Sequence, residues 1–443
     1  MTVSATLIRG ATLVTCDAAD RVIRGDLLIR DGRIAGLGRV RAPNGVRTID
    51  ARDCIVLPGL IMAHVHLCQV LMRGMADDLP LLEWLRKRIW PLEAAHDEVS
   101  IRASAELGLA EMLLAGTTAA LDLGTVHHHD AVFDACVRSG IRVVGGKSLM
   151  DSGAGVPRQL KERLSHALDD GERLERRWSS HESGRVHYAW IPRFILSCSE
   201  RLIRGACERA RASHAVMHTH AAEHPGERLA VRSALGADDV VILRRWGFYG
   251  PRASIAHGVQ LTSAQMRRLA QDETSVVHCP SANLKLGSGI AAVAKMRATG
   301  LTVGLGADGA PCNNNLDPWL EMRHAALLSS GVAGPGALPA RQVLRLATID
   351  GARVLGLAHQ IGSLELGKSA DVVVVGTRGP HSVPTPDPVG TLVYATQARD
   401  VEHVFVGGRA VVDHGQLTTL EVDRVVRVAR EQAGRLARRA KVA

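Results

Sequence analysis

The chain has 443 residues, a formal net charge of +9 at pH 7 and 46% apolar residues. This length fits a barrel of about 250 residues plus a smaller domain, and the apolar content excludes general disorder. Aromatic residues make up only 3% of the chain, which argues against the stacking platforms that bind single-stranded nucleic acid. The eight cysteines form no CxxC pair, and the chain contains no apolar run of 18 residues and no signal peptide. We therefore expect a cytoplasmic protein with reduced cysteines and with neither a membrane nor a nucleic-acid partner.

The first 57 residues have the composition of short strands. Residues 5–14 and 26–30 are strand-like, and Asp31-Gly32 before the return strand 33–37 is a strong hairpin signal. A further strand-like run, 47–57, leads to Pro58-Gly59. These features predict a small β domain over residues 1–57.

From residue 58 to residue 360, strand-like and helical stretches alternate. The apolar strand-like runs cover residues 118–122, 142–146, 186–191, 215–220, 254–257, 275–278 and 302–306. Helical stretches lie between them, among them residues 100–114, 200–212, 227–235, 263–271 and 291–299. Repeated βα units form a parallel sheet, and about eight of them close into a (β/α)8 barrel.

The strand pattern returns after residue 360. Residues 371–375 read as a buried strand, and 401–406 and 409–412 form a hairpin around Gly407-Gly408. We therefore expect an α/β fold in which residues 1–57 and 361–415 form one β-sandwich, with the (β/α)8 barrel of residues 58–360 inserted into it. Residues 416–443 have a helical pattern with a basic excess, for which we expect a solvated basic helix.

Polar residues with metal-binding potential stand at the ends of the strand-like runs. His64 and His66 are spaced i, i+2, so both side chains point to the same face of a strand and can reach one metal ion. Later runs end in His220, His257, His278 and Asp308, and Glu223 follows His220 by three residues. In a (β/α)8 barrel these ends form the catalytic face.

Three histidines and one carboxylate suit one Zn²⁺ or Fe²⁺ ion that keeps an open position for water. Such an ion acidifies its water to a hydroxide nucleophile, and Glu223 is placed to shuttle protons to a substrate. His278 is expected to orient its neighbours, and His127-His128-His129 is expected in a solvated loop. Cys279 and Cys312 have no base paired with them in their motifs, which disfavours a cysteine nucleophile.

The order His64-Val65-His66, His220, His257, Asp308 resembles that of the amidohydrolase superfamily. Residues 362–371 are similar to its returning β-sandwich segment. No lysine stands at a strand end in a clear bridging role, and the position of Glu223 resembles the mononuclear deaminase branch.

Within that branch, residues 73–85 and 89–93 resemble deaminases of 5′-modified adenosines, which act on S-adenosylhomocysteine, methylthioadenosine or 5′-deoxyadenosine. The resemblance implies that Trp84 lines the pocket and that Glu93 accepts hydrogen bonds from the ribose hydroxyls. In contrast, Pro192-Arg193-Phe194 and Lys147 resemble guanine deaminases, whose matching arginine touches the purine.

The resemblance implies a hydrolase of the C–N bond of a cyclic amidine, with one Zn²⁺ (or Fe²⁺) per chain on His64, His66, His220 and Asp308. Hydroxide attack on C6 of a 5′-modified adenosine would give the inosine derivative and ammonia. Glu223 would protonate N1, Asp308 would take the water proton, and His257 would polarise the hydroxide. The expected substrate-binding residues are Trp84, Glu93, Arg193, Glu223 and Asp308.

The family likeness also implies a homo-oligomer, a dimer or a tetramer, that acts on a small-molecule substrate. The alternatives are deamination of guanine or of another aminopurine or aminopterin, and deamination or dechlorination of an s-triazine. A catalytically inactive scaffold with the same fold is the alternative from another class of protein.

Overall fold

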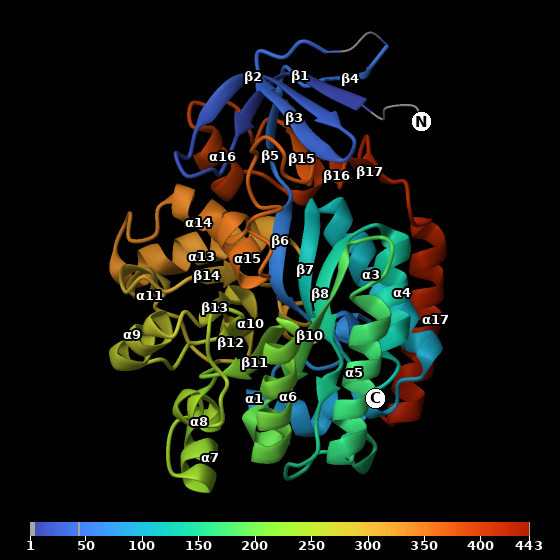
Figure 1. The fold of residues 1–443 in the computed structure, drawn as a ribbon, viewed down its shortest axis with the longest axis vertical. Helices are drawn as coiled ribbons and strands as arrows, with labels where there is room; N and C mark the ends of the chain where they lie inside the picture. The colour runs from blue at the N-terminus through green and yellow to red at the C-terminus, as the bar shows by residue number, and fades with distance from the viewer. Residues whose placement is uncertain (1–4, 43–44, 443) are drawn as a thin grey trace.

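The computed structural model describes residues 5–42 and 45–442, and its strands form two separate sheets (Figure 1). The larger part of the chain forms a parallel barrel with helices around it, and strands from both ends of the chain form the second sheet. The expected fold class is therefore confirmed.

The barrel sheet contains eight main strands that all run parallel. They are β6 (Leu60–Val65), β7 (Thr117–Leu123), β8 (Arg142–Gly146), β10 (Val186–Pro192), β11 (Val216–Ala221), β12 (Ala253–His257), β13 (Ser275–His278) and β14 (Val303–Leu305), in this order around the sheet. The short β9 (Ser148–Leu149) pairs with the end of β10. The amide of Asp308 donates to the carbonyl of His64 at 3.0 Å, which brings the end of the last strand to the first.

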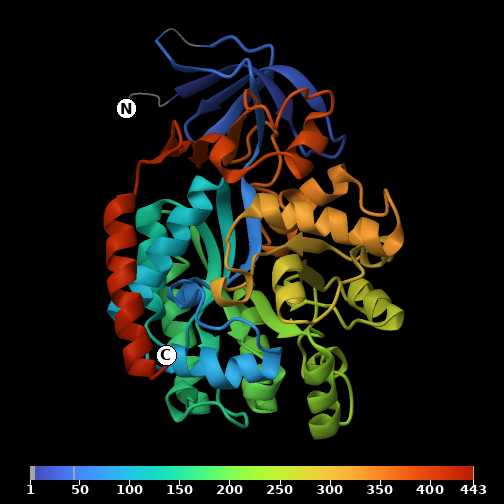
Figure 2. The ribbon, with the colours of Figure 1, turned by 180° about the vertical axis from the view of Figure 1, so that it is seen from behind.

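Helices cover the outside of the barrel (Figures 1 and 2). The longer ones are α3 (Glu98–Leu114), α4 (His129–Ser139), α5 (Leu164–Trp178), α6 (Glu200–Ser213), α7 (Pro225–Leu235), α9 (Ser263–Gln271) and α13 (Pro318–Ala333). The shorter helices of the chain are α1 (Leu81–Trp84), α2 (Trp90–Ala94), α8 (Asp239–Arg245), α10 (Pro280–Lys285), α11 (Val293–Ala298), α12 (Ala310–Asn313), α14 (Ala340–Leu346), α15 (Ile349–Val354) and α16 (Pro388–Tyr394), of which α16 lies beside the second sheet (Figure 1). Every residue of β6 and β7 is buried, as expected for parallel strands covered on both faces.

The second sheet joins the two ends of the chain. Its strands run in the order β18 (Gln416–Leu417), β17 (Arg409–Asp413), β16 (Val401–Val406), β15 (Val372–Gly376), β5 (Cys54–Pro58), β1 (Ala5–Val14), β2 (Val22–Arg30) and β3 (Arg33–Gly38). Asp31 and Gly32 both have positive φ, 49° and 76°, which matches the two-residue turn expected between β2 and β3. The run expected at 47–57 consists of two strands, because β4 (Arg47–Asp50) ends before β5 and both pair with β1.

This second sheet lies at the end of the barrel where the strands begin (Figure 1). Strand β5 leads through Gly59 directly into β6, and the guanidinium of Arg142, at the start of β8, forms a buried ion pair with Asp371 at 3.0 Å. The carboxyl ends of the barrel strands, where polar side chains were expected to gather, therefore lie at the opposite end of the molecule.

The C-terminal segment forms helix α17 (Val422–Ala440), which lies along the outside of α3 (Figure 2). Its buried residues, Val425, Ala429, Gln432 and Leu436, lie on one face, and Arg439 donates to the carbonyl of Ala95 at 2.8 Å. The helix is therefore attached to the barrel along one side and is not solvated all round. Among the residues that the structure describes, no helix is both long and apolar enough to cross a bilayer.

Candidate functional site

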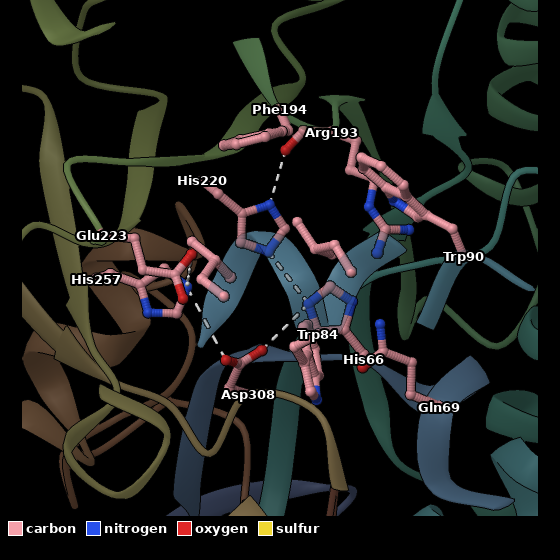
Figure 3. A pocket seen from close by; sticks show the side chains of 12 residues that line it. His66, Gln69, Trp84, Trp90, Arg193, Phe194, His220, Glu223, His257 and Asp308 are labelled. Carbon is pink, nitrogen blue, oxygen red and sulfur yellow. Dashed lines mark hydrogen bonds and ion pairs between the residues drawn. The ribbon is translucent and has the colours of Figure 1, made fainter. Parts of the chain in front are cut away.

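Four buried side chains from four strand ends meet on the catalytic face of the barrel (Figure 3). His64 lies in β6, His220 in β11 and His257 at the end of β12, while Asp308 follows β14. One potential ligand atom from each of the four lies within 4.8 Å of all the others. His66, directly after β6, completes the set, because its Nε2 is 3.2 Å from both Asp308 Oδ1 and His220 Nε2.

The protonation of these histidines is fixed by groups behind them. Nδ1 of His66 is 2.8 Å from the carbonyl of Leu123, and Nδ1 of His220 is 2.7 Å from the carbonyl of Arg193. A carbonyl oxygen only accepts, so each Nδ1 carries the proton and each Nε2 presents a lone pair to the centre of the site.

Two facing lone pairs 3.2 Å apart repel each other unless a cation lies between them. Nε2 of His64 is also buried without a hydrogen-bond partner, although it lies 3.2 Å from Asp308 Oδ1. Histidine nitrogens and one carboxylate oxygen that converge in this way fit the ligand set of a divalent metal ion.

The electrostatics of the site keep the imidazoles neutral and the carboxylate charged. Burial lowers the pKa of His64 to about 4 and that of His220 well below its ordinary value. Burial alone would raise the pKa of Asp308, but the neighbouring imidazoles of His64 and His66, each 3.2 Å away, hold it well below its usual range. Neutral imidazoles and an ionised aspartate are the protonation states that bind a metal ion.

His64 is supported by a residue that the sequence reasoning missed. Nδ1 of His64 is 2.8 Å from Nε2 of His218, and Nδ1 of His218 is 2.8 Å from Oγ of Ser254. The signal was present, since His218-Thr219-His220 repeats the i, i+2 spacing of His64 and His66. Such hydrogen bonds behind a ligand fix its orientation and tautomer.

Glu223 lies beside the histidine cluster in the turn that leaves β11 (Figure 3). Its Oε2 is 3.5 Å from Nε2 of His257, and that imidazole is held from behind by Asn283 Oδ1 at 2.9 Å. Burial raises the pKa of Glu223 well above its ordinary value, and the negative charge of Asp308 acts in the same direction. The raised pKa favours the protonated form of this carboxyl group, from which a proton can pass to a bound molecule.

A small cavity opens beside these groups. Its apolar lining comes from Leu81, Trp84, Leu85, Trp90 and Phe194. The polar side consists of His66, Gln69, Arg193, His220, Glu223, His257 and Asp308. The segment 81–94 thus supplies two indole walls opposite the polar groups (Figure 3).

Glu93 is placed differently from the expectation. Its two carboxylate oxygens accept from Arg193 at 2.7 and 3.0 Å, and Oε1 also accepts from Nε2 of Gln69 at 2.8 Å. Arg193 and Gln69 line the cavity, whereas Glu93 lies behind them. Gln69, three residues after His66, was not singled out from the sequence, and its Oε1 is buried without a partner.

Lys147 does not reach the cavity, because its ammonium group is fully buried in ion pairs of 2.8 Å with both Glu162 and Asp170. The likeness of Lys147 to guanine deaminases therefore does not bring its side chain to the cavity. His127 and His128 are exposed, whereas His129 begins α4 and is buried. Only the first two agree with a solvated loop.

The cysteines near the site have the character of unreactive core residues. Burial, followed by the negative charge of Asp308, raises the pKa of Cys279 and of Cys312 well above the ordinary thiol value. A thiol held in this way does not form the thiolate needed for nucleophilic attack. His278 is buried near His257 but does not line the cavity.

Comparison with known proteins gives consistent results. The sequence pattern of the family described as "Amidohydrolase family" matches residues 55–411. The 5-methylthioadenosine/S-adenosylhomocysteine deaminase of Moorella thermoacetica is 37% identical over 95% of this chain and 96% of its own length. The 5'-deoxyadenosine deaminase of Methanosarcina acetivorans is 36% identical over 98% and 99%. The crystal structure of an adenosine deaminase from Xanthomonas campestris with bound zinc superposes with a TM-score of 0.92, at 29% identity, over 98% of both chains.

Proposed function

Because this chain belongs to the amidohydrolase family, we propose that it is a metal-dependent hydrolase that deaminates a 5′-modified adenosine to the inosine derivative and ammonia. The substrate would be 5′-deoxyadenosine, methylthioadenosine or S-adenosylhomocysteine, in line with the relatives of similar sequence. The observation that carries the chemistry is the convergence of Nε2 of His66 and Nε2 of His220 on Asp308, next to Glu223 with its raised pKa.

In this proposal His64, His66, His220 and Asp308 hold one divalent metal ion. Such an ion, when bound, acidifies a water molecule and so supplies a nucleophile near neutral pH. Asp308 accepts a proton from the attacking water, and its low pKa suits a group that is ionised at the start of the reaction. His257 donates its Nδ1 proton to Asn283, so its Nε2 lone pair faces the site and can polarise the attacking water by accepting a hydrogen bond from it.

Glu223 is the proton donor to the ring. Attack at C6 of an adenine moves electrons onto N1, and a neutral carboxylic acid beside that nitrogen can protonate it. Glu223 is 3% exposed, so its proton is not shared with bulk water. This proton stays on N1 of the product, the proton that Asp308 took from the water passes to the leaving amino group, which departs as ammonia, and the Glu223 carboxylate takes the remaining hydroxyl proton.

The cavity lining supports a flat heterocycle between the indoles and the polar wall. Trp84 and Trp90 provide apolar area, while Arg193 donates hydrogen bonds and Gln69 Oε1 is an unused acceptor. Glu93, which was expected to bind the ribose hydroxyls, would influence the substrate through Arg193 and Gln69, because its oxygens already accept from both.

A second candidate is the deamination of guanine or a related amino-heterocycle, with an s-triazine as the more distant variant. The observation that favours it is the pairing of Glu93 with Arg193, which presents guanidinium N–H groups to the base rather than a free carboxylate to a ribose. Both candidates use the same hydrolytic attack on the ring. They differ only in which part of the substrate the Arg193 side of the cavity recognises.

Ammonia release from a substrate panel tests the proposal. The panel contains 5′-deoxyadenosine, methylthioadenosine, S-adenosylhomocysteine, adenosine, adenine, guanine and an s-triazine. We expect the highest kcat/KM for one of the 5′-modified nucleosides. A preference for guanine over every nucleoside would replace the first candidate by the second, and no ammonia from any member would overturn both.

We further propose that the metal is zinc, that the protein acts in the cytoplasm and that it forms a homo-oligomer. Three imidazoles with one carboxylate are common zinc ligands. All eight cysteines are free, which suits a reducing compartment. Exposed Leu320, Leu327 and Val332 on α13 offer apolar surface for subunit contact. Elemental analysis and light scattering on the purified protein test the metal and the subunit number.

A further inference from the structure

The turn that carries Glu223 is held by two buried carboxyl groups that have no part in the chemistry proposed above. Glu227 lies in the first turn of α7 and Asp239 begins α8, and these two helices adjoin the end of β11 (Figure 1). Their exposed fractions are 0% and 2%. Among the residues that the structure describes, neither carboxyl forms an ion pair with a lysine, an arginine or a histidine.

Three consecutive backbone amides of this turn point at the two carboxyl groups. The amide of Ala222 donates to Asp239 Oδ2 at 2.5 Å, and the amides of Glu223 and His224 donate to Glu227 Oε2 at 2.8 and 3.3 Å. Ala222 has a φ of +53°, a left-handed conformation that costs energy for a residue with a side chain. The hydrogen bonds to the carboxyl groups hold the backbone in this conformation immediately before Glu223.

The two carboxyl groups also lie beside each other, because they accept from the adjacent amides of Ala222 and Glu223. A hydrogen bond between two carboxyl groups needs one proton, and two adjacent buried carboxylates without a cation cannot both be ionised. Asp239 accepts from two backbone amides, those of Ala222 and Val240, and stands at the start of a helix, which favours its anionic form.

The shared proton is more favourably placed on Glu227 than on Asp239. Its Oε1 accepts from no donor, so a proton on that atom would be the donor to Asp239. Burial and the charge of Asp239 raise the pKa of Glu227 well above its ordinary value. A neutral Glu227 also spares Glu223 a full negative charge at close range.

We propose that Glu227 and Asp239 share one proton, carried by Glu227, and together form a clamp on the amides of Ala222, Glu223 and His224 that positions the Glu223 side chain for proton transfer. This inference rests on the proposed role of Glu223 and makes Glu227 a positioning residue. The clamp differs from ordinary helix capping, in which Glu227 would bind only the amide of His224, the residue that caps α7. Here Glu227 accepts from the amide of Glu223 at 2.8 Å and from that of His224 at 3.3 Å.

The clamp predicts an asymmetry between two conservative variants. The glutamine of E227Q can donate to Asp239 and accept from both amides, as a protonated glutamate does, so kcat should stay within a few-fold of the wild type. The asparagine of D239N has one acceptor oxygen where the aspartate uses two, so it should lose activity. E227A should lower kcat by roughly 10²-fold with little change in KM or bound metal, because a small displacement of a catalytic group has this effect.

Asp238 provides the matched control. It lies next to Asp239 and pairs with Arg228 of α7 at 2.9 Å, but it touches none of the three amides. D238N should therefore keep wild-type kcat even if α7 and α8 become less stable. Wild-type kcat in E227A, or an equal loss of kcat in D238N, would overturn the clamp. An active D239N beside an impaired E227Q would overturn the assignment of the proton.

Amide hydrogen exchange separates this inference from the proposed function. The amides of residues 222–224 should exchange slowly in the wild type and in E227Q, and faster in E227A and D239N. This readout needs no substrate, so it tests the clamp even if the wild type releases no ammonia from the panel. Equal exchange of these amides in the wild type and E227A would show that no clamp exists.

Discussion

The guanidinium of Arg193 and the carboxylate of Glu93 form a two-point ion pair, with distances of 2.7 and 3.0 Å, between segments 100 residues apart in the chain. Both side chains are nearly fully buried, with exposed fractions of 3% and 5%. The planar fork of an arginine matches a carboxylate at two points, which fixes its orientation in the cavity. Glu93 therefore determines how Arg193 faces the substrate.

This relationship predicts the effect of Glu93→Ala. Removing one partner of a buried ion pair leaves the other charge uncompensated, at a cost of about 3–5 kcal/mol. We expect kcat/KM to fall on nucleosides and on free bases alike, because Arg193 loses its orientation for both. Steady-state kinetics with a nucleoside and with adenine measure this. A loss confined to nucleosides would show instead that Glu93 binds the ribose hydroxyls directly.

The metal site gives a second prediction. Purified protein should contain close to one zinc or iron ion per chain, and His66→Ala should lose most of it, because the remaining ligands hold the ion less tightly. His278→Gln is the control, since His278 is equally buried near His257 but donates no atom to the cluster. Two ions per chain by elemental analysis would contradict a mononuclear site.

Glu223→Gln separates catalysis from metal binding. The glutamine has nearly the same shape but cannot give up a proton, so kcat should fall by roughly 10²–10⁴-fold, the usual contribution of a positioned acid–base group. Metal content and substrate binding should remain. If the variant loses its metal, Glu223 is a ligand rather than a proton donor.

The pH dependence of the reaction follows from the direction of the Glu223 shift. Burial, then the charge of Asp308, raises the pKa of Glu223, so the acid form persists to a higher pH than in an ordinary glutamic acid. As pH rises through this raised pKa the proton is lost, and kcat should fall on the alkaline side. The pH–rate profile of the wild type measures this fall. A profile that declines only on the acid side would contradict the assignment of Glu223 as an acid.

His129 predicts a pH dependence of stability. Burial lowers its pKa from 6.5 to about 3, and neither ring nitrogen has a hydrogen-bond partner. Below pH 6.5 the unfolded chain binds a proton that the folded chain does not, so the free energy of unfolding decreases as pH falls, by about 2 kcal/mol between pH 6.5 and pH 5 for this group.

Replacing His129 by leucine removes this contribution. Denaturant titrations at pH 7 and pH 5 should show that His129→Leu becomes more stable relative to the wild type at the lower pH. His128→Leu offers the control, because it removes a neighbouring imidazole that is exposed. An unchanged difference between wild type and His129→Leu at the two pH values would refute the prediction.

The sequence was sufficient for features that depend on local periodicity. The two-residue Asp31-Gly32 turn set the hairpin register, and the alternation of strands and helices set the barrel. The i, i+2 spacing of His64 and His66 was informative because a strand repeats every two residues and strand ends share one face of a barrel. Each of these signals lies within a few residues of the chain.

Contacts between distant loops were not accessible in the same way. Gln69, Glu93 and Arg193 come from three separate connections of the barrel, and only their packing shows that Glu93 supports the other two. Lys147 ends β8 in sequence, as a site residue would, yet its long side chain turns to Glu162 and Asp170. The direction of a side chain at a strand end depends on partners that no local pattern reveals.

The place of β15 between β5 and β16 has a consequence for biosynthesis. Asp308, the last of the proposed metal ligands, is synthesised well before residues 372–376 of β15. These residues of β15 pair with β5, and β5 leads into β6, the strand that carries His64 and is followed by His66. Until β15 is made, β5 has one unpaired edge with buried-type residues, the kind of edge that promotes misassociation of nascent chains. The strand that leads into the barrel therefore keeps an open edge until the C-terminal strands are made, and pairing with β15 closes that edge.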